Sequence, residues 1–325
     1  MRLGIIGCGL IGQKRVQAAL ALGYEVAMVA DIDPRRTATL AGRAKAKATQ
    51  DWREVAEADL DAVVIAATHE FLSEMSIACC AAGKHVLVEK PAGRNAKEVG
   101  AVATAAREHN RVVKVGFNHR FHPAILKARE IFESGALGPM MYIRGRYGHG
   151  GRIGYEKEWR CVREKSGGGE LIDQGAHLID LSRWFLGELT LDYAATPTYF
   201  WDIPVDDNCF LALKAPGGQI AWLHATWSEW KNMFSLEIVG RDGKLTIDGL
   251  GGSYGLERLT YHKMLPQMGP PETTIWEYPF PDTSWDRELQ NFSTAIETGC
   301  RATGDIEDAL AMHKLIDQAY GLASV

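Results

Sequence analysis

A carboxylate and an imidazole lie four residues apart in the second half of the chain, after three consecutive glycines. The segment runs from Gly167 to Asp180 and carries Asp173 and His177 in an apolar helical pattern. On an α-helix this spacing places both side chains on one face. An imidazole beside a carboxylate can act as a general base that the carboxylate orients, and glycines let another molecule approach the backbone. The alternative is a hydrogen-bonded histidine in a buried core helix.

A second cluster of glycines stands at the start of the chain, where an apolar strand beginning at residue 2 or 3 runs into Gly-x-Gly-x-x-Gly. Gly7 permits a tight turn, Gly9 lets the backbone approach a pyrophosphate, and Gly12 lets the following helix pack closely on the strand. A helical pattern follows from about Ile11 to Leu22. At its N-terminus, Leu10 and Ile11 offer N–H groups and a partial positive charge to phosphates. The pattern predicts a dinucleotide site.

The next strand, Glu25–Ala30, ends on Asp31. An acid at this position accepts hydrogen bonds from the adenosine ribose hydroxyls and repels a 2′-phosphate, which favours NAD over NADP. Arg35 and Arg36 follow closely. Because an arginine can bind a phosphate there, NADP stays open as an alternative.

Strands and helices alternate up to about residue 120, and each strand is a nearly continuous apolar run. This pattern is typical of a doubly wound parallel sheet covered on both faces. Ligands bind such sheets beyond the carboxyl ends of the strands, so we expect Asp31, Thr68, Glu89, Lys90 and Asn118 to face one crevice. The expected elements after the second strand are Asp61–Ala67, Phe71–Ala82, His85–Glu89, Asn95–His109 and Arg111–Gly116.

Lys90 follows one of these strands and precedes Pro91. The proline restricts Lys90 to extended conformations, which would fix the direction of the amine. An ammonium group near a substrate hydroxyl stabilises the negative charge that develops on the oxygen. The alternative is a surface lysine at the end of a strand.

The pattern changes after residue 120, where strand-like runs follow one another without intervening helices. Their alternation of apolar and polar residues predicts an open, mainly antiparallel sheet with one wet face, in a second α+β domain. The expected domains are 1–121 and 122–325. A wet, open sheet edge favours a homodimer or homotetramer over a monomer. The expected elements are Met140–Tyr147, Leu191–Phe200, Cys209–Lys214, Gln219–Thr226, Phe234–Val239, Lys244–Asp248, Leu256–Tyr261 and Thr274–Tyr278, and then the helices Trp285–Thr298 and Ile306–Tyr320.

The composition is that of a globular enzyme. At 325 residues the chain is long enough for two cores, and its net charge of -5 does not suggest a nucleic-acid binder. No apolar run approaches the length of a membrane span, and the first residues already form a strand, which leaves no room for a signal peptide. The six cysteines show neither zinc-ligand spacing nor a disulfide framework. We therefore expect a cytoplasmic protein that binds neither metal, membrane nor nucleic acid.

The segment from Arg144 to Lys165 contains seven basic residues against three acidic ones. Arginines in this place could hold the diphosphate of a nucleotide-sugar, although a solvated loop of mixed charge has the same composition. Trp159 stands beside Arg160 and offers a flat surface to a sugar ring or to nicotinamide. We expect these two residues to contact the substrate.

These motifs, in this order, resemble the glucose-fructose oxidoreductase, inositol dehydrogenase and MocA family over essentially the whole chain. The resemblance implies a Rossmann domain joined to an open-sheet domain, oligomers built across that sheet, and a catalytic group of Lys90, Asp173 and His177. One departure concerns the third strand, after which family members commonly read Thr-Pro followed by a histidine. This chain has Thr68-His69 there, which puts the role of a downstream histidine in doubt. The matching motifs are Gly7–Gly12, Glu89–Pro91, Gly116–Phe121, Trp159-Arg160 and Gly167–Asp180.

The expected reaction is reversible hydride transfer between a nicotinamide cofactor and the hydroxyl or keto carbon of a sugar, a cyclitol or a nucleotide-linked sugar. His177 would exchange the hydroxyl proton, Asp173 would orient the imidazole, and Lys90 would stabilise the oxygen. A first alternative is a redox-neutral glycoside hydrolase that keeps NAD bound. A second is an NAD-binding regulator without catalysis, which the three catalytic candidates disfavour because a sensor needs none of them.

Overall fold

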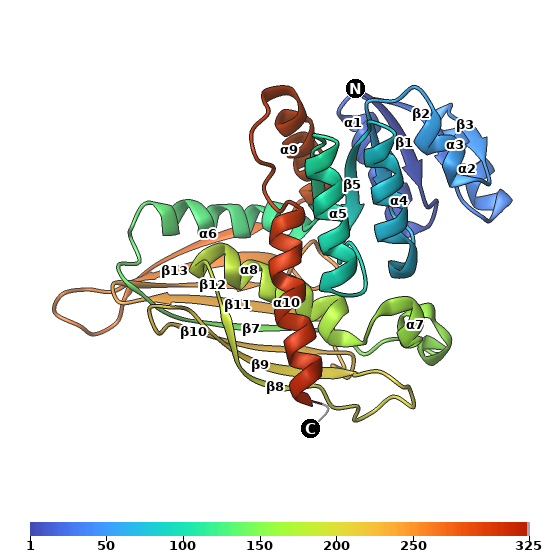
Figure 1. The fold of residues 1–325 in the computed structure, drawn as a ribbon. Helices are drawn as coiled ribbons and strands as arrows, with labels where there is room; N and C mark the ends of the chain where they lie inside the picture. The colour runs from blue at the N-terminus through green and yellow to red at the C-terminus, as the bar shows by residue number, and fades with distance from the viewer. Residues whose placement is uncertain (324–325) are drawn as a thin grey trace. The chain divides into compact units, whose positions relative to one another are not determined.

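The structure, a computed structural model, describes residues 1–323 and divides into two compact units. The first unit contains Met1–Asn118 and Trp285–His313. The second unit contains His119–Ser284 and the residues from Lys314 onward. Each unit holds one sheet, and Figure 1 shows the order of the elements along the chain.

The first unit is built on a six-stranded sheet in the order β3-β2-β1-β4-β5-β6, with every neighbouring pair parallel. This order reverses direction between β1 and β4, which is the topology of dinucleotide-binding sheets. The predicted doubly wound parallel sheet is therefore confirmed. The strands are β1 Arg2–Ile6, β2 Glu25–Ala30, β3 Lys47–Thr49, β4 Ala62–Ile65, β5 His85–Glu89 and β6 Val113–Gly116. The helices are α1 Leu10–Ala21, α2 Pro34–Ala44, α3 Trp52–Glu57, α4 His69–Ala81, α5 Ala96–Glu108 and α9 Ser284–Thr298.

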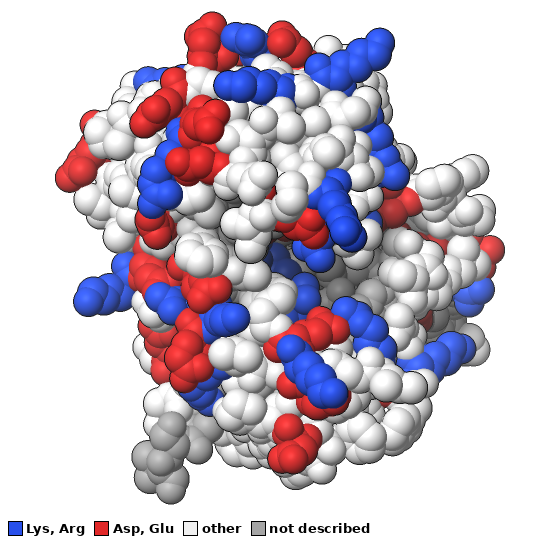
Figure 2. Space-filling model, turned by 90° about the vertical axis from the view of Figure 1, so that its right-hand side faces the viewer, with Lys and Arg blue, Asp and Glu red and all other residues white. Residues whose placement is uncertain are grey.

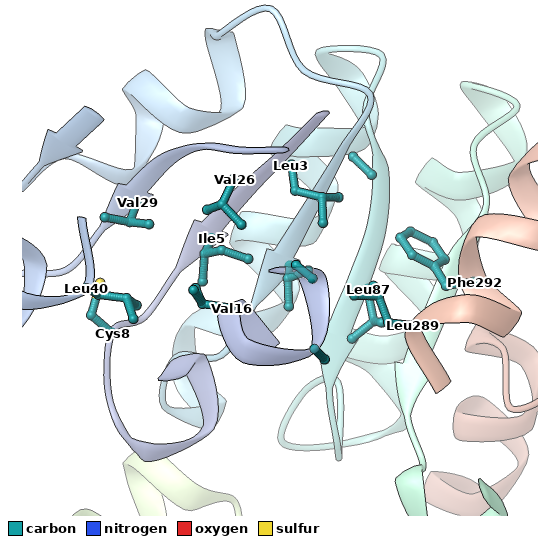
Figure 3. Packing of buried hydrophobic residues seen from close by; sticks show 14 of the residues in the cluster. Leu3, Ile5, Cys8, Val16, Val26, Val29, Leu40, Leu87, Leu289 and Phe292 are labelled. Atoms are coloured by element: carbon teal, nitrogen blue, oxygen red, sulfur yellow. The ribbon is translucent and has the colours of Figure 1, made fainter. Parts of the chain in front are cut away.

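Apolar side chains of β1 and β2 form the centre of this core, including Leu3, Ile5 and Val29 (Figure 3). Leu289 and Phe292 of α9 are fully buried in the same cluster. Because these two side chains complete the core, the segment Trp285–His313 groups with the first unit, whereas the sequence analysis ended the first domain at residue 121.

Three elements of this unit, α2, β3 and α3, were not predicted from the sequence. Both helices nevertheless begin with an ordinary capping signal. Asp33 accepts hydrogen bonds from the backbone N–H groups of Arg35 and Arg36, and Pro34 occupies the first helical position. Asp51 caps α3 in the same way. The strand β3 has three residues and α3 has six, so their hydrophobic pattern is weak.

The second unit is built on an eight-stranded sheet in the order β14-β13-β12-β11-β7-β10-β9-β8. Among its described strands only one neighbouring pair, β7 with β10, is parallel. The predicted open, mainly antiparallel sheet is therefore confirmed. The strands are β7 Met140–Gly148, β8 Thr190–Ala195, β9 Asn208–Lys214, β10 Ile220–Thr226, β11 Met233–Gly240, β12 Gly243–Asp248, β13 Glu257–Lys263 and β14 Glu272–Tyr278.

Two helices, α6 (Pro123–Glu133) and α8 (Ala176–Leu186), cover one face of this sheet (Figure 1). A Cβ on Gly145 of β7 would lie 3.1 Å from Leu178 of α8, so the glycine allows close packing of the helix on the sheet. The opposite face carries exposed side chains, among them Trp222 and Ile275. Helix α6 was not predicted, and it precedes β7, the first strand of this sheet along the chain. The last helix, α10, spans Ile306–Ala323.

The predicted strand Leu191–Phe200 is shorter in the structure, where β8 ends at Ala195. The backbone N–H groups of Tyr199, Phe200 and Trp201 instead donate to the carboxylate of Asp207. Because a side chain takes these donors, the backbone leaves the sheet there.

The surface carries charges of both signs side by side, as Figure 2 shows for one face. Among residues 1–323, no helix is long and apolar enough to cross a membrane.

Candidate active site

The three glycines of the first loop differ in their surroundings. Gly7 has a φ of +94°, and a Cβ there would lie 2.3 Å from the carbonyl oxygen of Ala66. A Cβ on Gly12 would lie 1.8 Å from the carbonyl oxygen of Gly7, whereas a Cβ on Gly9 would meet nothing within 4 Å. Gly7 and Gly12 are thus required by the protein's own packing, and Gly9 leaves open space above the loop. This geometry fits a dinucleotide whose pyrophosphate approaches the backbone at Gly9.

Helix α1 begins at Leu10, directly after this loop, without a side-chain cap and without an acidic residue in its first turn. The first N–H groups of a helix have no partner within the helix, and an acidic cap would repel an anion. The start of α1 is therefore suited to bind phosphate oxygens.

Asp31 lies at the end of β2 and contacts the glycine-rich loop. Its Oδ2 accepts a hydrogen bond of 2.7 Å from the backbone N–H of Cys8, and its Oδ1 accepts one of 2.9 Å from Asp33. A carboxylate has further lone pairs, so these bonds leave acceptors for ribose hydroxyls. Ile32, which the sequence analysis missed, is 89% exposed, and Leu10 is 71% exposed. Two exposed apolar side chains on this loop region suit the base and ribose of a dinucleotide.

The other predicted cofactor residues of the first unit follow β4, β5 and β6. Thr68 is the N-cap residue of α4, and its hydroxyl donates to Glu70. Glu89 ends β5, and its Oε1 accepts a hydrogen bond of 2.7 Å from Nε of Arg15. Burial raises the pKa of Glu89, and Arg15 opposes this shift only in part. Lys90 is half-buried, and Asn118, at the start of a 3₁₀ turn, is buried.

The predicted catalytic pair of the second unit lies on a helix that changes type between its members. Leu171–Gly175, with Asp173, forms a π-helical turn, and His177 stands in the first turn of α8. The expectation of a regular α-helix through both residues was therefore wrong. A π turn is wider than an α turn and often occurs at functional sites. Both side chains are buried, with Asp173 8% and His177 4% exposed.

Asp173 forms an ion pair with Arg160, one of the two residues predicted to contact the substrate. Its Oδ2 lies 3.4 Å from Nε of Arg160. The guanidinium of Arg160 lies 4.7 Å from the ring centre of Trp159. Burial alone would lower the pKa of Arg160, but Asp173 and other neighbouring acidic groups raise it overall, so the side chain stays cationic. The structure thus brings Trp159, Arg160 and Asp173 together.

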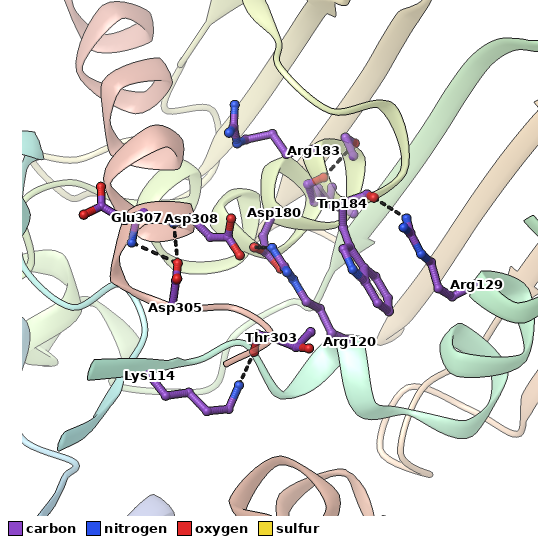
Figure 4. Close-up of polar contacts among 12 residues, drawn as sticks. Lys114, Arg120, Arg129, Asp180, Arg183, Trp184, Thr303, Asp305, Glu307 and Asp308 are labelled. Atoms are coloured by element: carbon purple, nitrogen blue, oxygen red, sulfur yellow. Dashed lines mark hydrogen bonds and ion pairs between the residues drawn. The ribbon is translucent and has the colours of Figure 1, made fainter. Parts of the chain in front are cut away.

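His177 stacks on His119, a residue that the sequence analysis did not assign to the site. The ring centres are 3.6 Å apart and the rings are inclined by 15°. Tyr147 of β7 lies at 6.2 Å from His177, edge to face. Arg120, next to His119, forms two hydrogen bonds of 2.8 and 2.6 Å with Asp180 of α8 (Figure 4). This bidentate ion pair joins the segment of His119 to the helix of His177, and so fixes the two rings against each other.

The glycines before Asp173 serve the protein's own packing. A Cβ on Gly168 would lie 2.0 Å from the hydroxyl of Tyr320, and one on Gly169 would lie 1.9 Å from the carbonyl oxygen of Asp206. Gly167 has a φ of +85°, which favours glycine. The expectation that these residues open the backbone to another molecule does not fit, because protein atoms already occupy the space beside Gly168 and Gly169.

The predicted site residues therefore form two sets, one in each unit. The first unit holds the glycine-rich loop, Asp31, Thr68, Glu89, Lys90 and Asn118. The second unit holds Trp159, Arg160, Asp173 and His177.

Comparisons with known proteins bear on both sets. A family model described as an oxidoreductase family with an NAD-binding Rossmann fold matches residues 1–117. A second model, described as the GFO/IDH/MocA C-terminal domain, matches residues 125–246.

Several curated dehydrogenases are similar in sequence. Levoglucosan dehydrogenase of Pseudarthrobacter phenanthrenivorans is 27% identical over 286 residues, which cover 76% of this chain and 73% of that protein. Inositol 2-dehydrogenase 2 of Saccharopolyspora erythraea is 32% identical over 226 residues, covering 67% of this chain and 64% of that protein. The D-xylose 1-dehydrogenase (NADP(+)) 2 of Haloferax volcanii is 26% identical over 329 residues, covering 98% of this chain and 96% of that protein.

Solved structures share the fold over the whole chain. Levoglucosan dehydrogenase in complex with NADH and levoglucosan superposes with a TM-score of 0.90 at 24% identity, covering 100% of this chain and 97% of that chain. The WlbA dehydrogenase from Bordetella pertussis, in complex with NADH and UDP-GlcNAcA, has a TM-score of 0.83 at 20% identity, covering 100% of this chain and 96% of that chain.

Proposed function

This chain belongs to the GFO/IDH/MocA family of NAD-binding oxidoreductases, and we propose that it oxidises a hydroxyl carbon of a sugar or cyclitol, or reduces the corresponding ketone, with NAD. The observation that carries the proposal is the second unit's ion pair of Asp173 with Arg160, whose guanidinium lies over the ring of Trp159. His177, four residues after Asp173, is the proton acceptor of the proposal. The curated relatives named above act on levoglucosan, inositol and D-xylose, which supports this substrate class.

Cofactor binding is assigned to the first unit. Gly7, Gly9 and Gly12 shape the loop. The N–H groups of Leu10 and Ile11 at the start of α1 would hold the pyrophosphate. Asp31 accepts hydrogen bonds from the adenosine ribose, which favours NAD over NADP because a 2′-phosphate would meet its negative charge. The remaining contacts are assigned to Thr68, Glu89, Lys90 and Asn118. Bound NAD supplies the hydride acceptor.

Three side chains would act on the substrate. His177 takes the proton of the reacting hydroxyl during oxidation and returns it during reduction. Asp173 stabilises the protonated imidazole, and Lys90 stabilises the negative charge that develops on the oxygen. Trp159 and Arg160 contact the remainder of the substrate.

Two of the seven basic residues before the catalytic helix, Arg144 and Arg152, already pair with carboxylates. Arg144 forms an ion pair of 2.5 Å with Glu237, and Arg152 forms one of 2.5 Å with Glu158. A phosphate would have to displace these carboxylates before it could bind the guanidinium groups. Free sugars, anhydrosugars and cyclitols are therefore favoured over nucleotide-linked sugars.

The first experiment is a search for NADH formation with the purified protein, NAD or NADP, and a panel of levoglucosan, myo-inositol, aldoses, glycosides and UDP- or dTDP-linked sugars. We expect turnover with NAD and a free sugar or cyclitol. Release of a leaving group without net NADH would replace the proposal by the redox-neutral hydrolase. Tight cofactor binding with neither outcome would leave a regulator.

The second experiment tests the role of His177. A positioned base contributes about 100- to 10,000-fold to rate, so His177→Ala should lower kcat by that order while the Kd for NADH stays nearly unchanged. Leu178→Met, on the same helix, is the matched control and should retain activity. Equal kcat in His177→Ala and the wild type would refute the assignment.

We further propose a homodimer or homotetramer in the cytoplasm. The outer face of the second sheet carries Tyr193 and Trp222, each 49% exposed, which stack with 6.3 Å between ring centres. Exposed stacked aromatic rings are typical of interfaces. Trp222→Glu should lower the molar mass measured by light scattering, and an unchanged mass would exclude this face. The proposed cytoplasmic location is supported by the six cysteines, because all are free thiols, as expected in a reducing compartment.

A further inference from the structure

Lys90 stands between two residues that the first unit holds in place. On one side, Oε1 of Glu89 accepts a hydrogen bond of 2.7 Å from Nε of Arg15 and lies 2.6 Å from Nη2 of the same guanidinium. On the other side, the carbonyl oxygen of Pro91 lies 2.8 Å from Nε2 of His313. Glu89 and Pro91 are buried, whereas Lys90 is half-buried.

The contact on the Glu89 side is part of a buried network of charges. Arg15 also lies 2.7 Å from Glu288 of α9, and Lys114 of β6 lies 3.8 Å from the same carboxylate. The side chains of Arg15, Glu288 and Lys114 are fully buried. The network contains two cations, Arg15 and Lys114, and two carboxylates, Glu89 and Glu288. Moving any one of these groups would leave a buried charge without its partner, which costs free energy. Glu89 therefore has little freedom to move.

The contact on the Pro91 side fixes the backbone directly. His313 is fully buried, and because a carbonyl oxygen can only accept, Nε2 carries the hydrogen. One residue further on, Ala92 has a φ of +71°, in the left-handed region that residues with a Cβ rarely adopt, and its N–H donates to the carbonyl of Glu89. Such a conformation persists only where the surroundings enforce it. His313 is one of the groups that do so here.

We infer that Arg15 and His313 are positioning residues that set the direction of the Lys90 side chain. Neither is a member of the set of cofactor or substrate contacts assigned above. They act through Glu89 and Pro91, the two residues bonded to Lys90. This inference rests on the proposed function only in so far as Lys90 acts on the substrate.

The test uses two substitutions of nearly equal shape, His313→Gln and His313→Met, in the full chain. Glutamine keeps an N–H donor for the carbonyl of Pro91, and methionine does not. The measurements are kcat and KM with the panel compound that turns over, the Kd for NADH by fluorescence titration, the Tm, and a crystal structure of each variant with NADH.

A displacement of about 1 Å in a catalytic group can cost about 100-fold in rate. We expect His313→Met to lower kcat about 10- to 100-fold and to displace Lys90 or to divide it between conformers. His313→Gln should keep kcat within about 5-fold of the wild type. Because Lys90 is also assigned a cofactor contact, the Kd for NADH of His313→Met should rise by a smaller factor than kcat falls. Arg15→Met should reproduce the loss of kcat, provided that its Tm shows a folded protein.

Three outcomes would overturn the inference: equal kcat in the two His313 variants, an unchanged Lys90 in the His313→Met structure, or a loss of NADH affinity that parallels the loss of kcat. Lys90→Met separates this failure from that of the proposed function. Full activity in Lys90→Met would refute the catalytic role of Lys90. A large loss in Lys90→Met with full activity in His313→Met would refute only the positioning role.

Discussion

Two Gly→Ala substitutions in the glycine-rich loop can distinguish its role in packing from its role in cofactor binding. In Gly12→Ala the new Cβ would lie 1.8 Å from the carbonyl oxygen of Gly7, and ordinary contact begins at 3.4 Å. The loop and α1 would therefore have to move apart by about 1.6 Å. Overpacking of this degree costs about 3 kcal/mol, which lowers the Tm by about 5 °C or more.

In Gly9→Ala the new Cβ meets no protein atom within 4 Å, and Gly9 has a φ of -70° that alanine also adopts. Apart from a capping cost of about 1 kcal/mol or less, stability should be unchanged. The methyl group would nevertheless occupy the space through which a pyrophosphate approaches the backbone. We expect the Kd for NADH to rise at least about 10-fold, or about 1.4 kcal/mol.

The assays are thermal unfolding without cofactor and fluorescence titration with NADH. Ala18→Gly, in the middle of α1, is the control for a general loss of helix stability. If Gly9→Ala bound NADH as tightly as the wild type, the pyrophosphate would not lie against Gly9. If Gly12→Ala kept the wild-type Tm, the close approach of α1 to the loop would not be a structural requirement.

Two further predictions concern a thiol of the glycine-rich loop and a carboxylate of the second unit. Iodoacetamide at pH 7.5 should label Cys300, which is exposed, and should leave Cys8 intact, because burial first and Asp31 second raise the pKa of Cys8 to about 12. Peptide mass spectrometry reads the result, and rapid labelling of Cys8 would contradict it. Asp207→Asn should destabilise the second unit by about 2 kcal/mol at pH 7, because the charged acceptor of three backbone N–H groups is lost. Burial tends to raise the pKa of Asp207, but hydrogen bonds from Trp201 and Asn208 lower it overall. Its stabilisation is therefore complete above the unfolded pKa of about 4 and disappears as pH falls through the folded value. Urea unfolding should show a difference between the wild type and Asp207→Asn that shrinks in acid, and a constant difference would refute the argument.

The first unit was the more predictable part of the fold, because its signals are local. The strand, the glycine triplet, the helix and the terminal Asp31 follow one another within a short segment, and each residue type has one geometric reason to be there. The core partners from α9 could not be predicted in this way. Phe292 packs against strands almost the full length of the chain away, and no local pattern records that contact.

The second unit's site was predicted only in part. Asp173 and His177 were found from their spacing, but the π turn between them depends on packing around the helix. His119 was visible in the sequence beside a strand end, yet its stacking on His177 requires the ion pair of Arg120 with Asp180. A contact that two distant segments create has no signal in either segment alone.

The neighbouring residues Asp206 and Asp207 show why a carboxylate's role cannot be inferred from its position in the chain. Asp206 accepts hydrogen bonds from two backbone N–H groups and from Tyr320, yet its pKa is raised because complete burial outweighs these bonds. Asp207 accepts from three backbone N–H groups and from Asn208, and its pKa is lowered because its hydrogen bonds outweigh the cost of burial. Both carboxylates hold loops of the second unit in place. Two adjacent carboxylates with similar sets of hydrogen bonds thus shift their pKa values in opposite directions.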